Sequence, residues 1–134
     1  MKDNLFKKFK KIGEYRLNNE SKKIERKITN KKIKISERLC LVYAFFIDDN
    51  CKYIGKTIQG YKRPLGYHKN IYMPTVYNNL KKNAEINKVI EIYCRVFEKK
   101  EIEFEELLIN PFSAYEEALI NKLGVHKLWN NQKY

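Results

Sequence analysis

The sequence predicts an α+β protein in which one small antiparallel sheet of three strands is covered by helices. Three observations lead to this prediction. Residues 39–47 form a continuous apolar run of β-prone residues, as expected of a buried strand. A second extended segment, residues 51–55, follows a turn-forming cluster at residues 48–50, which indicates a β-hairpin. A third β-prone segment, residues 88–97, is separated from this pair by helical patterns.

The first 38 residues are expected to form a basic, helical extension. They hold 14 Lys and Arg against 5 Asp and Glu, so nine of the twelve excess positive charges lie here. Leu5, Phe9 and Ile12 recur at helical spacing among lysines, and Ser21 is a candidate N-cap for a second helix. Alternation over residues 32–36 is typical of a short strand. A basic helix can lie on a membrane, but its narrow apolar face favours packing against the rest of the chain.

Residues 39–134 are expected to form one domain that follows this extension. After the hairpin come a loop at 56–60, an interrupted helix at 61–72, a helix at 75–84, the strand at 88–97, an acidic segment at 101–106 and a helix at 111–123. Asn110 and Pro111 open the last helix and Gly124 ends it. With 134 residues, 43% of them hydrophobic, the chain can bury the core of one domain.

Charge and composition narrow the classes of partner. A net charge of +12 attracts polyanions, so nucleic acid is the first expectation and an anionic membrane surface the second. The uncharged runs are too short to span a bilayer, and the first residues lack the pattern of a secretory signal. The three cysteines, Cys40, Cys51 and Cys94, form no CxxC pair, so we expect reduced thiols in a cytoplasmic protein.

Four polar residues around the hairpin match the needs of phosphodiester cleavage. The sequence has no Gly-rich phosphate loop, no CxxC pair and no HExxH motif. Cleavage needs a metal ligand, a cation on the phosphate, a group that prepares water and a group that protonates the leaving oxygen. One carboxylate, Glu116, one arginine, Arg63, and two tyrosines, Tyr43 and Tyr53, can supply all four.

Five elements in order resemble the GIY-YIG nuclease family. They are Leu41-Val42-Tyr43, Tyr53-Ile54-Gly55-Lys56, Arg63, Glu116-Glu117-Ala118-Leu119-Ile120 and Trp129-Asn130. The resemblance covers residues 39–132 and is greatest to the small stand-alone phage-type endonucleases of this family. It implies a GIY-YIG-like catalytic domain at 39–134 and a DNA endonuclease activity.

The resemblance also implies catalytic roles for particular residues. Tyr43 would prepare the attacking water, and Tyr53 would orient the phosphate or assist the proton transfer. Arg63 would bind the scissile phosphate and stabilise its developing charge. Glu116 would hold one divalent cation, Mg²⁺ or another such as Mn²⁺. His68 would be the histidine that many members carry on the helix after the arginine.

Further roles concern the nucleic acid. Lys56 and Lys62 would assist phosphate binding, and Asn130 would brace the site. The expected partner is double-stranded DNA held by the basic extension, with no membrane association. Cutting both strands with one site per chain would favour a homo-oligomer, a dimer or a tetramer.

Tyrosine is a weak base at neutral pH because its ordinary pKa is about 10. A nearby metal together with Arg63 and Lys56 is expected to stabilise the phenolate.

Other interpretations of the same residues stay open. Tyr43 and Tyr53 also fit core positions, and Ser113 with Glu116 fits a capping box. Glu117 competes with Glu116 for the metal. The alternative function is a non-catalytic basic module that binds DNA or RNA on the same fold. Glu116 separates the two functions, because a pure binder gains nothing from a carboxylate that repels phosphate.

Overall fold

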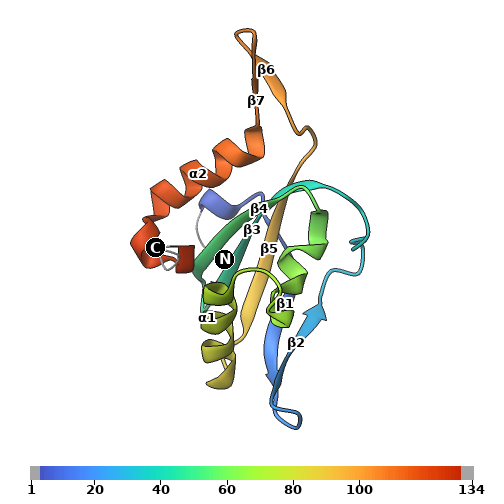
Figure 1. Cartoon of the computed structure of the whole chain (residues 1–134), viewed down its shortest axis with the longest axis vertical. Coiled ribbons are helices and arrows are strands. Elements are labelled where there is room, and N and C mark those ends of the chain that lie inside the picture. The colour runs from blue at the N-terminus through green and yellow to red at the C-terminus, as the bar shows by residue number, and fades with distance from the viewer. Residues whose placement is uncertain (1–3, 131–134) are drawn as a thin grey trace.

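A five-stranded antiparallel sheet forms the centre of the molecule, with strand order β2-β1-β5-β3-β4 (Figure 1). The structure is a computed structural model that describes residues 4–130. The strands are β1 (Lys10–Asn18), β2 (Lys23–Ile28), β3 (Cys40–Ile47), β4 (Asn50–Thr57), β5 (Ile90–Phe97), and a separate pair, β6 (Ile102–Phe104) and β7 (Leu107–Ile109). The helices are α1 (Pro74–Glu85), α2 (Pro111–Leu123) and four short 3₁₀ turns, η1 (Asn4–Phe6), η2 (Gly60–Lys62), η3 (Pro64–Lys69) and η4 (Val125–Lys127).

The α+β class is confirmed, whereas the prediction of three strands is wrong because the sheet has five. The three strands expected from the sequence are β3, β4 and β5, and they are adjacent in the sheet. Both main helices are also confirmed. The side chain of Asn110 caps α2 by accepting a hydrogen bond from the Ser113 amide at 3.0 Å, and Gly124 ends the helix.

The two helices predicted for the N-terminal segment are wrong, because residues 10–18 and 23–28 form strands β1 and β2. The physical reason is that side chains alternate between the two faces of β1, and the many charged residues of the segment hide this alternation in the sequence. Tyr15 points into the core while Glu14 lies on the opposite face, where Lys11 pairs with it and with Glu91 of β5 at 3.1 and 2.8 Å. Lys11 thus links β1 to β5 through an ion pair. The basic segment contributes two strands to the main sheet.

The short strand predicted for residues 32–36 is also wrong. This segment belongs to the connection between β2 and β3, which has no strand or helix. Ile33 and Ile35 are half-buried against the core, and the lysines between and beside them are exposed. The apolar residues of the alternating pattern therefore anchor a loop to the core. Contact of this basic segment with DNA stays a prediction.

Helices cover both faces of the sheet, and two apolar clusters fill the space. One face packs against α1 and η3, and its largest buried residues include Tyr15, Tyr43, Phe45, Leu65, Tyr67 and Leu80. The other face packs against α2 and η1 through Phe6, Phe9, Val42, Ala44, Phe46, Phe112 and Leu119. Strand β3 contributes to both clusters in alternation, which explains why its sequence is a continuous apolar run. None of the helices within residues 4–130 has the length and apolar composition needed to cross a membrane.

Strand β4 is an edge strand, and Asn130 satisfies part of its free backbone edge. The Asn130 side-chain oxygen accepts from the Ile54 amide at 3.1 Å, and its amide nitrogen donates to the Ile54 carbonyl at 2.7 Å. Asn130 is buried, so water does not replace these bonds. One side chain thus acts as a short extra strand that closes the edge beside α2.

We expect Asn130→Ala to lower the free energy of unfolding by about 2–3 kcal/mol, because it leaves the buried amide and carbonyl of Ile54 without partners. Denaturant unfolding followed by circular dichroism measures this change. Asn121→Ala is the matched control, since Asn121 is exposed on α2 and its loss should change stability by less than about 0.5 kcal/mol. Equal effects of the two substitutions would contradict the proposed role of the Asn130 amide.

Candidate active site

The aromatic ring of Tyr43 lies across the strand that carries the second tyrosine. Tyr43 on β3 is opposite Gly55 on β4 in the strand register. A β-carbon placed on Gly55 would lie 2.3 Å from Cζ and 2.5 Å from the hydroxyl of Tyr43. Only glycine therefore leaves room for the ring. The glycine of the Tyr-Ile-Gly motif is therefore explained by the packing of the Tyr43 ring.

Three tyrosine hydroxyls converge on this face of the sheet. The Tyr43 and Tyr67 hydroxyl oxygens are 2.5 Å apart, and the Tyr53 and Tyr67 oxygens are 3.5 Å apart. The ring centroids of the three residues are separated by 5.9 to 6.1 Å, so the rings form a triangle that packs on Phe45. Since all three residues are buried, each hydroxyl depends on its neighbours for hydrogen bonds.

Strand β1 fixes the turn that supplies Tyr67. The Tyr15 hydroxyl donates to the Pro64 carbonyl and accepts from the Tyr67 amide at 3.0 Å. The Tyr15 hydroxyl therefore fixes the backbone of η3 at two points, Pro64 and Tyr67. Tyr15 is fully buried, and burial raises the pKa of its hydroxyl far above the ordinary value, so it remains a donor at neutral pH. The N-terminal basic segment thus positions the candidate site as well as carrying charge.

Arg63 lies beside the tyrosine triangle at the entrance of η3. Its guanidinium carbon is 4.0 Å from the Tyr72 ring centroid and 5.9 Å from that of Tyr67. Burial lowers the pKa of Arg63, but the hydroxyls of Tyr67 and Tyr43 outweigh it and the net change is upward. The buried Arg63 Nε has no hydrogen-bond partner within residues 4–130. A charged fork with an unsatisfied donor is suited to bind an anion.

Burial dominates the protonation of the tyrosines. It raises the pKa of the Tyr43 hydroxyl well above its usual value, the neighbouring tyrosines raise it further, and Arg63 lowers it by less. The pKa of Tyr53 is also raised, by burial first and then by Tyr67 and Glu116. In the absence of a bound metal or substrate, burial therefore outweighs the stabilisation of a phenolate that was expected from Arg63 and Lys56. Both hydroxyls are protonated at neutral pH.

Helix α2 places Glu116 near this group along the edge strand β4. The charge of Glu116 contributes to the raised pKa of Tyr53, so its carboxylate lies within electrostatic range of that hydroxyl. Glu116 is half-buried, whereas Glu117 is exposed. Because Asn110 caps the helix, the capping-box interpretation of Ser113 and Glu116 is wrong. Within residues 4–130 no three His, Cys, Asp or Glu side chains gather as a metal cluster.

The two candidate phosphate-binding lysines contact different parts of the molecule. The Lys56 ammonium donates to the Ser113 hydroxyl at the start of α2. Lys62 is exposed and lines a hollow of about 300 Å³ that it shares with Ile35, Arg38 and the β2–β3 connection. Lys56 therefore lies on the α2 side of β4, and Lys62 lies beside the basic segment.

Two other predicted site residues lie apart from the tyrosine triangle. The His68 ring packs against Tyr15 at 5.7 Å and lines a hollow between β1, β2 and α1. Burial lowers the pKa of His68, and the charges of Arg26 and Lys69 lower it further. Asn130 is buried and bonds the Ile54 backbone, so it supports the site through β4.

Tyr67 is the residue of this cluster that sequence reasoning missed. It is adjacent to His68, to which the family resemblance gave the role. Adjacent residues of a 3₁₀ turn point in directions about 120° apart, so Tyr67 and His68 lie on different faces of η3, which begins at Pro64. Pro64 was the residue in the sequence that could have indicated the start of this turn.

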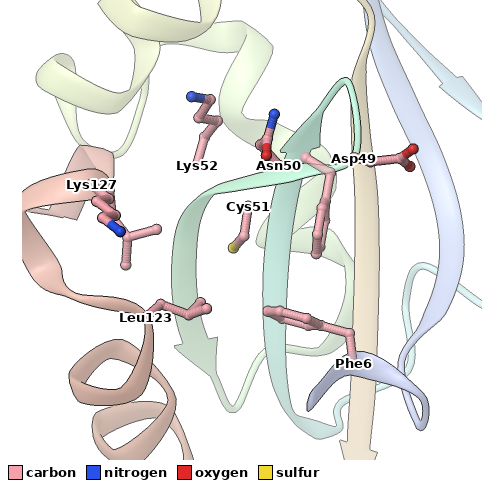
Figure 2. A pocket seen from close by; sticks show the side chains of 9 residues that line it. Phe6, Asp49, Asn50, Cys51, Lys52, Leu123 and Lys127 are labelled. Carbon is pink, nitrogen blue, oxygen red and sulfur yellow. The ribbon is translucent and has the colours of Figure 1, made fainter. Parts of the chain in front are cut away.

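A larger hollow lies away from these residues. It has a volume of about 520 Å³ and lies between η1, the β3–β4 turn and the end of α2 (Figure 2). Neither the tyrosines nor Arg63 line it. Size alone therefore does not locate the candidate site.

Comparison with solved structures identifies a nuclease fold. The chain is similar to the restriction endonuclease HPY188I in complex with product DNA, with a TM-score of 0.54 and 20% sequence identity over 87% of this chain and 74% of that chain. It is also similar to a mutant of bacteriophage T4 EndoII, with a TM-score of 0.63 and 20% identity over 85% of this chain and 86% of that chain. No family model and no curated protein matches the sequence.

We expect Gly55→Ala to lower the free energy of unfolding by about 1–3 kcal/mol, because the added methyl group overlaps the buried Tyr43 ring. The change is measured by denaturant unfolding. In a Tyr43→Leu background the same substitution should cost little, since the overlapping ring atoms are absent. A cost that is equal in both backgrounds would show that Gly55 serves the backbone and not the tyrosine.

Proposed function

We propose that this protein is a divalent-metal-dependent endonuclease of the GIY-YIG type that hydrolyses phosphodiester bonds in double-stranded DNA. The observation that carries the proposal is the convergence of three tyrosine hydroxyls with a guanidinium whose Nε lacks a partner within residues 4–130. The nuclease fold supports it, since one of the similar structures is a restriction endonuclease with its product DNA.

Arg63 binds the scissile phosphate in this proposal. Stacking on Tyr72 holds the guanidinium plane, and the Nε–H group is available to a phosphate oxygen. The positive charge stabilises the extra negative charge that develops on the phosphate oxygens as water attacks. The fixed plane of Arg63 gives a geometry that a flexible ammonium does not reproduce.

The tyrosines hold and deprotonate the attacking water. Once the substrate is bound, Tyr43 first releases its own proton to solvent, and its phenolate oxygen then takes a proton from the attacking water. The hydrogen bond to Tyr67 shares the phenolate charge. Tyr53 orients a phosphate oxygen through its hydroxyl. Burial disfavours ionisation of Tyr43 and Tyr53 in the free protein, so deprotonation depends on the bound phosphate and its counter-ion.

Glu116 is the residue that would hold the divalent cation. Mg²⁺ typically binds one or two carboxylates and keeps several waters and substrate phosphate oxygens as its other ligands. A single half-buried carboxylate beside the phosphate site fits this donor set, and Mn²⁺ fits it equally. The bound cation would neutralise charge on the leaving oxygen.

The basic segment, Lys56 and Lys62 extend contact along the duplex in this proposal. Lys62 and Arg38 line one hollow, which is therefore positively charged. Lys56 supplies positive charge near α2. Backbone contacts of this kind give affinity that falls with salt and carries no base specificity.

The test is incubation of the protein with supercoiled plasmid DNA in Mg²⁺ and in EDTA. Cleavage is expected with Mg²⁺ and is expected to stop with EDTA. Glu116→Gln should abolish cleavage while DNA affinity holds or rises, because the substitution removes the charge that a hard cation needs and that repels phosphate. Glu117→Gln is the matched control and should cut normally, since Glu117 is exposed.

Reversed phenotypes would assign the metal to Glu117. Normal cleavage by both variants, or DNA binding without cleavage by the wild-type protein in Mg²⁺ and Mn²⁺, would contradict the nuclease proposal and favour the non-catalytic binding module.

A further inference from the structure

A two-stranded hairpin projects from the end of the molecule at which α2 begins (Figure 1). Strands β6 and β7 pair with each other and form a sheet separate from the main one. In an antiparallel pair, opposite residues lie on the same face, so Ile102, Phe104, Leu107 and Ile109 share one face. This face is fully apolar. A lone hairpin with such a face is marginally stable in water, which indicates that another surface covers it.

The exposure of the hairpin supports this conclusion. Phe104 is 57% exposed, Leu107 66% and Leu108, on the other face, 71%. Exposed apolar residues gathered on one projecting element mark a protein interface more often than a free surface.

The charge of the hairpin excludes DNA as the covering partner. Residues 101–109 contain four glutamates and no basic residue, whereas the other residues of the chain carry a net charge of +16. Glu105 and Glu106 form the tip of the turn, with φ of 50° and 67°. An acidic tip is repelled by phosphate and attracted by a basic protein surface. The body of this same protein is such a surface.

A groove at the other end of α2 has the matching chemistry. The 520 Å³ hollow is lined by apolar side chains, among them Phe6, Phe46, Leu123 and Leu128. Its charged lining is Lys52, Lys127 and one carboxylate, Asp49, so its net charge is positive. Figure 2 shows Phe6 and Leu123 pointing toward each other, with both lysines on the side away from Phe6. Neither lysine forms an ion pair with another residue in the range 4–130. We call this hollow the lysine-rimmed groove.

The hairpin cannot reach the groove of its own chain. The hairpin ends at Ile109, directly before α2, whereas the groove lies at Leu123, the last residue of α2. Thirteen helical residues separate the two ends by about 20 Å. In a two-fold dimer with the α2 helices antiparallel, each hairpin would instead meet the groove of the other copy.

We propose that this protein forms a two-fold dimer in which the apolar face and acidic tip of each β6–β7 hairpin dock in the lysine-rimmed groove of a second copy. The dimer buries both exposed apolar surfaces at once and pairs Glu105 and Glu106 with Lys52 and Lys127. The proposal concerns assembly and holds whether or not the protein cuts DNA.

The test measures mass in solution by light scattering after gel filtration. The wild-type protein should have twice the chain mass. Glu105→Lys with Glu106→Lys, and separately Lys52→Glu with Lys127→Glu, should each give monomers, because both contacts of either dimer then join like charges. A mixture of the two variants should form a dimer again, because each hairpin then meets a groove of opposite charge.

The matched control is Glu20→Lys with Glu85→Lys, which changes the net charge by the same amount as the hairpin variant at two exposed positions elsewhere. It should remain dimeric. The proposal would be overturned by a monomeric wild-type protein or by charge-reversal variants that remain dimeric. It would also be overturned if each variant alone were monomeric and their mixture stayed monomeric.

Discussion

The burial of three tyrosine hydroxyls under one arginine is the constraint on which the candidate site depends. Tyr43, Tyr53 and Tyr67 have little access to water, so their hydroxyls must be satisfied by one another and by Arg63. This requirement explains Gly55, whose missing side chain leaves space for the Tyr43 ring. A polar group of this kind fixes a unique arrangement, since any shift leaves a buried hydroxyl unpaired.

The basic N-terminal segment also supports the candidate site. Its Tyr15 hydroxyl holds η3 at Pro64 and Tyr67, so the turn that presents Arg63 and Tyr67 rests on strand β1. On β1, Lys11 pairs with Glu14 of the same strand and with Glu91 of β5. The residues of this segment thus complete the sheet and give the protein its positive field.

The sequence was sufficient to predict the β3–β4 hairpin, α1, β5 and α2, because their apolar patterns, turn residues and caps agree with each other. The strands β1 and β2 could not be predicted in this way. Leu5, Phe9 and Ile12 match a helical period, but Phe9 and Ile12 pack on opposite faces of the sheet, which only tertiary pairing decides. Tyr67 was missed for a similar reason, since the geometry of η3 and not its residue types separates it from His68.

The central claim is that Arg63 serves the cleaved phosphate and not the general affinity for DNA. The most direct measurement compares DNA binding with the single-turnover cleavage rate for Arg63→Lys, which keeps the charge but loses the planar fork. The account predicts nearly unchanged binding and a cleavage rate lower by a factor on the order of 10². A cleavage rate equal to that of the wild-type protein would contradict it.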